Sequence, residues 1–304
     1  MNKTAIISLS LLPTLHLSAI TWDGGGGDGL WSNPLNWDGD VLPTSDDNVV
    51  IDNATVTVDS PASAKQISLG NSGSSTVTLN VNSTLSYFDQ FGASDWGVVG
   101  DTISVNVGSG GLIDGGEASR IEGTATVTIG SGGMITGVYR QRIDPTILLD
   151  GGVYRFSGSS TGNPIGTYAL NNGSISGASG TLIFTATGDG LNLNIQPSSG
   201  VTFDVDQLTI QMEMLDGYTP QIGDSFDLFN NGGAFDLGDG SNIASETADG
   251  NWLITWDTSQ WNPGTALGKG VISIADVSSI PEPETYAGLL GLAALTMLAL
   301  RRRK

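Results

Sequence analysis

Residues 105–113, VNVGSGGLI, and residues 127–135, VTIGSGGMI, are close copies of one another, 22 residues apart. In each copy, alternating apolar residues lead into a Gly-Ser-Gly-Gly turn, and apolar residues follow it. Fainter copies lie on either side. The equivalent apolar positions are Val81, Val107, Ile129, Leu149 and Leu170, with spacings of 26, 22, 20 and 21 residues. A repeat of this length that contains only strands and turns is typical of one coil of a parallel β-helix.

The repeats therefore predict an all-β fold whose main part is a parallel β-helix-like solenoid. A single coil cannot bury its apolar side chains alone, so the inward Val, Ile and Leu of one coil pack on those of the next. Glycine suits the corners, because it tolerates the positive φ that a sharp turn requires. The irregular spacing leaves an antiparallel β-sandwich open as the alternative for the middle region.

The composition excludes several classes of function. The chain of 304 residues has 44 Gly, no Cys and a net charge of −20. Its one histidine, His16, lies in an N-terminal segment that we expect to be removed. A mature chain without Cys and His has no Ser-His-Asp triad, thiol nucleophile or His-ligated metal. The negative charge repels phosphate backbones, so we expect no nucleic-acid partner.

The two ends of the chain have the composition of targeting segments. At the N-terminus, Lys3 precedes an apolar stretch at residues 5–17, and small residues follow it, as in a secretory signal peptide. At the C-terminus, the uncharged run from Tyr286 to Leu300 predicts one transmembrane helix, about 22 Å long at roughly 1.5 Å per residue. This length is short for a bilayer, but flanking residues compensate when a basic cluster holds the inner face. That cluster is Arg301, Arg302, Arg303 and Lys304.

Pro281-Glu282-Pro283, then the apolar run, then the basic end resemble the PEP-CTERM sorting tail of exopolysaccharide-producing Gram-negative bacteria. The resemblance covers about the last two dozen residues. It implies that an exosortase in the membrane recognises Pro281, Glu282 and Pro283 and processes the tail. The protein would then be exported, held in the inner membrane by its C-terminal helix as an intermediate, and delivered to the cell surface or extracellular matrix.

Changes in composition divide the chain into five parts. We expect a signal peptide at 1–19, a Trp-rich N-terminal cap at 20–53, solenoid repeats at 54–200, a C-terminal β-module at 201–277 and the sorting tail at 278–304. The cap and the C-terminal β-module are similar to the first and last parts of other PEP-CTERM surface proteins. Those similarities concern architecture and imply no activity.

Two groups of residues are candidates for binding a glycan. Trp22, Trp31 and Trp37 would stack on sugar rings, or alternatively would seal the exposed first coil. Arg140, Arg142 and Arg155 belong to a cluster of basic residues in an otherwise acidic chain. We expect Arg142 and Arg155 to come together on one face, or alternatively each Arg to pair with one of the many Asp residues.

Carboxylates in Gly-rich turns are the only candidates for metal binding. They are Asp23, Asp28, Asp236 and Asp239. Oxygen ligands in flexible turns suit Ca²⁺, but neither turn matches an established calcium loop, and Asp and Gly are ordinary turn residues. We expect no cofactor, with Ca²⁺ as the alternative.

The leading hypothesis is an exported, non-catalytic surface or matrix protein that contributes to the exopolysaccharide matrix, to biofilm or to adhesion, with extracellular polysaccharide as its partner. The alternative is a carbohydrate-active enzyme, a polysaccharide lyase or hydrolase, or a glycan-binding protein on the same β-helix. A further alternative is an ice-binding protein, because Thr-x-Thr pairs occur at Thr55, Thr76 and Thr124. In the sequence these pairs do not recur once per repeat, and Thr is an ordinary strand residue.

Overall fold

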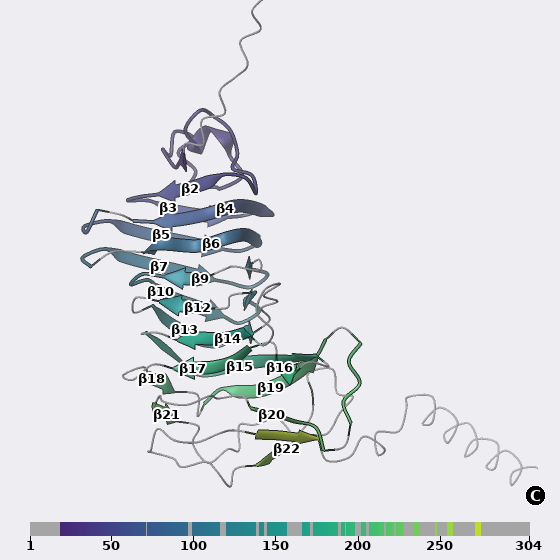
Figure 1. The fold of residues 1–304 in the computed structure, drawn as a ribbon. Helices are drawn as coiled ribbons and strands as arrows, with labels where there is room; N and C mark the ends of the chain where they lie inside the picture. Colours follow the sequence, from purple (N-terminus) through teal and green to yellow (C-terminus); the bar gives the residue numbers. More distant parts are fainter. Residues whose placement is uncertain are drawn as a thin grey trace, which may run out of the picture.

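The computed structural model describes residues 19–70, 72–96, 99–115, 120–137, 140–142, 145–156, 166–170, 173–187, 190–191, 193–197, 202–204, 207–215, 217–221, 223–227, 234–236, 247, 254–257 and 271–274. These residues form a parallel β-solenoid of roughly five turns, in which successive coils stack along one axis (Figure 1). The parallel pairing confirms the predicted solenoid and decides against the antiparallel sandwich. The expected transmembrane helix from Tyr286 to Leu300 lies outside the described residues, among which no helix is long and apolar enough to cross a membrane.

A 16-stranded sheet supplies two faces of the solenoid. Its first face consists of β3 (Thr55–Val58), β5 (Thr76–Val81), β7 (Thr102–Val107), β10 (Thr126–Gly130), the first halves of β13 (Thr146–Phe156) and β15 (Ser174–Thr187), β18 (Thr202–Asp204) and β21 (Ala234–Asp236). Its second face consists of β1 (Ile20–Thr21), β2 (Asn48–Ile51), β4 (Ala62–Leu69), β6 (Thr84–Trp96), β8 (Leu112–Gly115), β11 (Met134–Thr136), the second halves of β13 and β15, and β19 (Thr209–Met214). Every pairing along both faces is parallel.

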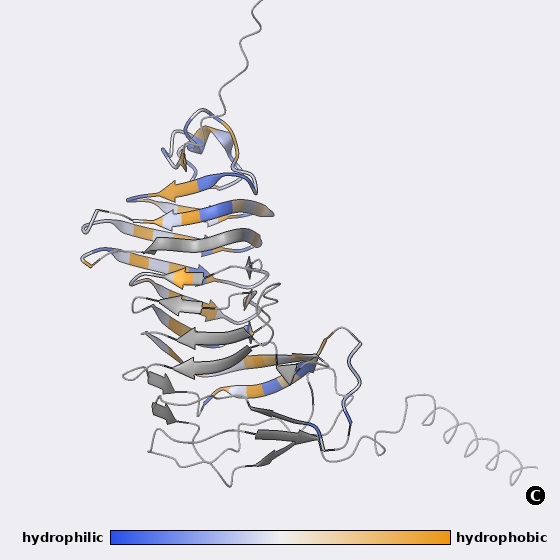
Figure 2. Cartoon of the chain, viewed as in Figure 1, coloured by the Kyte–Doolittle hydropathy of each residue, from blue (hydrophilic) through white to orange (hydrophobic). Residues whose placement is uncertain are grey.

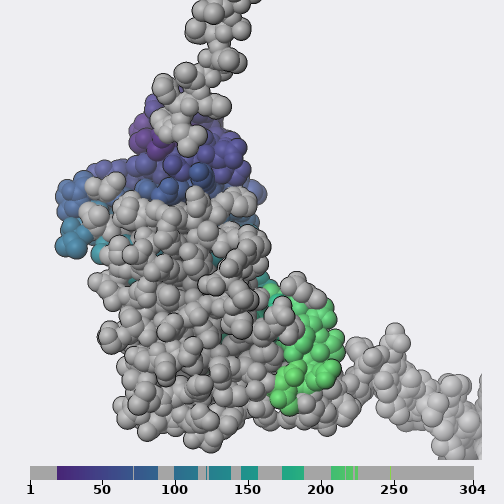
Figure 3. Space-filling view, viewed as in Figure 1, coloured from purple at the N-terminus to yellow at the C-terminus, as the bar shows by residue number. Residues whose placement is uncertain are grey.

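A separate four-stranded parallel sheet forms the third face. It consists of β9 (Arg120–Glu122), β12 (Arg140–Arg142), β14 (Gly166–Leu170) and β17 (Leu193–Pro197). The short strand β16 (Gly190–Leu191) pairs antiparallel with the end of β15. A three-stranded antiparallel sheet of β20 (Ser225–Asp227), β22 (Ile254–Asp257) and β23 (Val271–Ile274) follows the solenoid in sequence. The segment after β19 lies at the side of the stack, at the end far from the cap (Figure 3).

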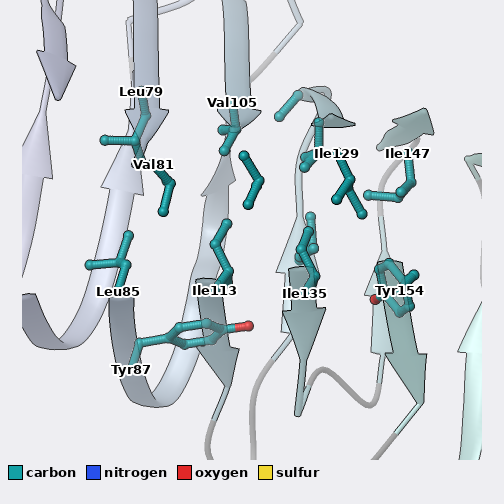
Figure 4. Close-up of a cluster of buried hydrophobic side chains, with 14 of the residues drawn as sticks. Leu79, Val81, Leu85, Tyr87, Val105, Ile113, Ile129, Ile135, Ile147 and Tyr154 are labelled. Carbon is teal, nitrogen blue, oxygen red and sulfur yellow. The ribbon is translucent and has the colours of Figure 1, made fainter. Parts of the chain in front are cut away.

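The core consists of aliphatic side chains that repeat in register from coil to coil (Figure 4). On the first face, Leu79 pairs with Val105, which pairs with Val127. On the second face, Leu85 pairs with Ile113, which pairs with Ile135. All these side chains are buried, and strand residues alternate between core and surface, so hydrophobic and hydrophilic residues alternate along the strands (Figure 2).

Three of the four predicted repeat spacings are confirmed by the register. Val81 pairs with Val107, Val107 with Ile129, and Ile129 with Leu149. The equivalence of Leu149 with Leu170 is wrong, because Leu149 pairs with Gly177. Leu170 instead ends β14 on the third face. The five-residue β14 replaces the three-residue β12 of the preceding coil, so this coil is longer than its neighbours.

The solenoid pairing extends beyond both expected boundaries. Strand β2, at residues 48–51, pairs with β4 although it lies before residue 54. Strands β18 and β19 pair with β15 although they lie after residue 201. Trp and Asp turn residues dominate the sequence around β2, and the short β18 has only three residues, so composition alone marks neither coil as a repeat.

A glycine at one corner tests how closely the coils stack. Gly137 has φ of +77°, and a Cβ at this position would lie 1.7 Å from the carbonyl oxygen of Gly115 in the preceding coil. Gly217 has φ of +67°, but a Cβ there would meet nothing within 4 Å. The substitution Gly217→Ala should therefore cost only the left-handed backbone, about 1–2 kcal/mol. Gly137→Ala should cost a further ~1–3 kcal/mol through the clash. Denaturant unfolding of both variants measures the difference, and equal losses would contradict the close stacking.

Candidate functional site

The three candidate tryptophans pack together in the N-terminal cap. Trp22 lies at the end of β1, and Trp31 and Trp37 flank the short helix η1 (Pro34–Asn36). Their exposed fractions are 8%, 2% and 0%, and both Trp22 and Trp31 meet Trp37 edge-on, with ring centroids 4.9 and 4.7 Å apart. The Nε1 of Trp37 donates a hydrogen bond to the carbonyl of Trp31 at 2.9 Å. A sugar needs an exposed ring face for stacking. The three rings are placed for sealing the first coil.

The cap also closes the exposed edge of both sheet faces. The backbone N–H of Trp31 donates to the carbonyl of Thr57 at 2.8 Å, and the N–H of Thr57 donates to Gly29 at 2.8 Å, which covers β3. On the second face, β1 pairs with β2, and the N–H of Trp22 donates to Val50. An unpaired edge strand is a template for association with another chain. The cap therefore ends the sheet at the N-terminal side.

The Gly-rich turn of the cap surrounds the carboxylate of Asp28. One oxygen of Asp28 accepts hydrogen bonds from the N–H of Leu30 at 3.0 Å and from Nδ2 of Asn36 at 2.7 Å, and the other accepts from Nδ2 of Asn33 at 2.8 Å. These donors, the Leu30 N–H first, lower the pKa of Asp28. A Cβ at Gly26 would lie 2.3 Å from the Asn33 amide nitrogen, so the glycine admits the amides.

The four calcium candidates have different surroundings. Asp28 receives only N–H donors from the groups described above, and Asp23 accepts from the N–H of Gly25 at 2.9 Å. Asp236 ends strand β21, and Asp239 lies outside the described residues. In the described part of the chain, no three His, Cys, Asp or Glu side chains gather where they could hold a metal ion. N–H donors neutralise a carboxylate in place of a cation, so the turn around Asp28 is a structural network.

The three candidate arginines do not share one face. Arg140 and Arg142 lie in β12 of the third face, where Arg140 pairs with Arg120 of β9 and Arg142 pairs with Glu122. Arg155 lies in the second half of β13, on the second face. The expectation that Arg142 and Arg155 come together is therefore wrong, because a corner separates β12 from the second half of β13.

Arg155 forms an ion pair that crosses a neighbouring coil. Its Nε donates to Oε2 of Glu213 in β19 at 2.6 Å, and β15 lies between the two strands. Its Nη1 lies 3.5 Å from Oγ1 of Thr136 in β11. Burial raises the pKa of Asp114, which neighbours Thr136 in the register, while the charge of Arg155 opposes the rise. The side chains of Arg155 and Glu213 are 24% and 29% exposed, so this polar cluster remains accessible from outside.

The outer side of the first face carries an array that sequence analysis missed. Two outward positions recur in each coil, and eleven of the twelve residues have a hydroxyl or amide group. We call this array the hydroxyl–amide surface. Its first column is Thr55, Thr78, Ser104, Thr126, Thr146 and Ser174, and its second column is Thr57, Asn80, Asn106, Thr128, Leu148 and Ser176.

The conclusion from sequence that such residues do not recur once per repeat is wrong. Coil lengths between Thr55 and Ser174 range from 20 to 28 residues, and this variation hides the columns. The Thr-x-Thr motif was also an inadequate signal, because Ser and Asn occupy equivalent positions. A search for any two small polar residues flanking an inward aliphatic residue would have found the array.

Comparison with protein families gives one match. Residues 279–304 match the model of the PEP-CTERM protein-sorting motif. The chain ends in a PEP-CTERM sorting motif. The matched segment includes Pro281, Glu282 and Pro283 and the basic end at residues 301–304, as expected from the sequence, and it implies processing by an exosortase. The motif lies outside the described residues. Comparisons with curated proteins and with solved structures found no match.

The Asp28 network gives a prediction for the pH dependence of stability. The pKa of Asp28 in the folded protein lies below its ordinary value of 3.8, so the ionised carboxylate stabilises the cap above that pH. This contribution is lost as the pH falls through the lower folded-state pKa. Asp28→Asn should lower the free energy of unfolding at pH 7, and its difference from the wild type should shrink under acid. Unfolding titrations from pH 7 to about 2 measure this, with exposed Asp38→Asn as the control. A difference that is constant with pH would contradict the role of the charge.

Proposed function

We propose that this chain is an exported, non-catalytic surface or matrix protein that contributes to the exopolysaccharide matrix, to biofilm or to adhesion. The PEP-CTERM motif at residues 279–304 carries the proposal, because it assigns the chain to the exosortase sorting route. The solenoid supplies the body that this route delivers. The rest of the proposal concerns what happens at the two ends and on the outer surface.

The two ends act in sequence. The signal peptide at residues 1–19 directs export, and the helix from Tyr286 to Leu300 then holds the chain in the inner membrane with its basic end on the cytoplasmic side. The exosortase recognises Pro281, Glu282 and Pro283 and removes the tail. The solenoid is then delivered to the cell surface or the matrix of a Gram-negative bacterium.

The body is suited to a structural role. In-register packing of buried side chains on two faces makes a solenoid stiff along its axis, because each coil is fixed by both neighbours. A net charge of −20 keeps such a surface soluble and separates it from other acidic chains. After residue 19 the sequence contains neither His nor Cys, which supports the assignment of a non-catalytic role.

The alternative function is glycan binding, or a carbohydrate-active enzyme, on the same scaffold. The accessible cluster of Arg155, Glu213 and Thr136 favours this alternative, since guanidinium, carboxylate and hydroxyl groups all form hydrogen bonds with sugars. Lyase or hydrolase chemistry needs Arg and carboxylate groups that converge, and Arg142 lies in a different sheet from Arg155. An enzyme would release shorter chains from the exopolysaccharide of its host, whereas a matrix protein would only retain them.

The sorting step is tested in the native host. Joint replacement of Pro281, Glu282 and Pro283 by Ala should leave the protein at its full C-terminal mass and in the membrane fraction. The wild type should lose its tail and leave that fraction. Glu284→Ala, one residue beyond the recognised turn, is the matched control and should behave as the wild type. Intact-mass analysis of each fraction gives the answer. If the wild type keeps residues 286–304 in the membrane, the tail is only an anchor and the proposal fails.

A further inference from the structure

The hydroxyl–amide surface is regular in both directions. Its columns run through β3, β5, β7, β10, β13 and β15 without a shift of register at any of the twelve positions. Neighbouring strands lie about 4.8 Å apart, and alternate residues of one strand lie about 6.6 Å apart. In one place the array bonds internally, where Nδ2 of Asn106 donates to Oδ1 of Asn80 at 3.0 Å. The side chains therefore form a two-dimensional lattice of polar groups.

The surface is also uncharged and accessible. None of its twelve residues is ionisable, although the chain carries a net charge of −20. Every position is exposed or partly exposed, while the residue between the two columns is buried in each coil. Thr side chains have restricted χ1 rotation, which fixes the direction of their hydroxyl groups. Few side-chain conformations therefore need to be fixed when a second surface docks.

The residue types limit what this surface recognises. It lacks the aromatic and Arg residues that anchor protein interfaces, and it has no apolar centre that a second copy of the chain could bury. It also lacks outward aromatic rings for sugar stacking. Its features are flatness, regular spacing, absence of charge and groups that both donate and accept hydrogen bonds.

We infer that the hydroxyl–amide surface binds ice. The surface of an ice crystal is a rigid, uncharged lattice of hydrogen-bond donors and acceptors, and its complement must share all four of these features. Hydroxyl groups hold first-layer water at fixed positions, and Thr methyl groups between them limit competing hydration. Charged side chains would bind liquid water instead and break the lattice. This function goes beyond the surface or matrix role and does not depend on how the chain is sorted.

The test uses the exported chain and measures the gap between the melting and freezing points, together with inhibition of ice recrystallisation. The wild type should produce both effects. Thr126→Lys places a charged, flexible side chain in the middle of the first column and should abolish most of the activity. Leu148→Thr completes the second column and should increase the activity.

A matched control separates loss of binding from loss of folding. Thr209→Lys introduces the same change at an exposed Thr on β19, on the second face, and should leave the activity unchanged. Circular dichroism near 0 °C should show the same β content for all variants. A folded wild type without either effect would overturn the inference, as would equal loss in Thr126→Lys and Thr209→Lys. A wild type that self-associates through this surface, and becomes monomeric on Thr126→Lys, would assign the surface to a second copy and also overturn it.

Discussion

The structure depends on the parallel register in which each coil places its buried aliphatic residues over those of the coil before it. Val105 lies between Leu79 and Val127, and each is buried. Burial of one such side chain is worth about 1.5–3 kcal/mol, and no single coil obtains it alone. Because side chains alternate in a strand, the same register fixes which residues face outward. The core thereby aligns the hydroxyl–amide surface, although the two share no side chain.

A stack of this kind must also end, and the ends use different physical means. At the N-terminus, Trp31 and Trp37 cover the first coil while backbone groups of the cap pair with β3. Asp28 and the two Asn amides hold the turn that positions these rings. Beyond β19, antiparallel pairing replaces parallel pairing in β20, β22 and β23. The cap therefore explains the Gly-rich acidic sequence at residues 23–29 without a metal ion.

Sequence reasoning predicted the solenoid because the repeats at residues 105–113 and 127–135 are nearly identical. It failed at Leu170, where local similarity to a repeat coincides with a strand of the third face. Arg142 and Arg155 were misplaced for a related reason, since distance along the chain does not show where a coil turns its corner. The polar columns were missed because varying coil lengths hide a periodicity that only the register of the core reveals. The sorting motif was recognised because its signal is local and needs no folded context.

The register of the coils is the central claim, and the absence of cysteine from the chain allows a direct measurement of it. Thr78 and Ser104 are paired neighbours in adjacent coils, whereas Thr78 and Thr126 are separated by one coil. A disulfide requires Cα atoms about 4.4–6.8 Å apart, and two coils span about 9.6 Å. Under mild oxidation, the double variant T78C/S104C should form an intramolecular disulfide, detected by intact mass and loss of free thiol. The double variant T78C/T126C should keep both thiols. Failure of the first pair to close, or equal closure of the second, would contradict the parallel stack.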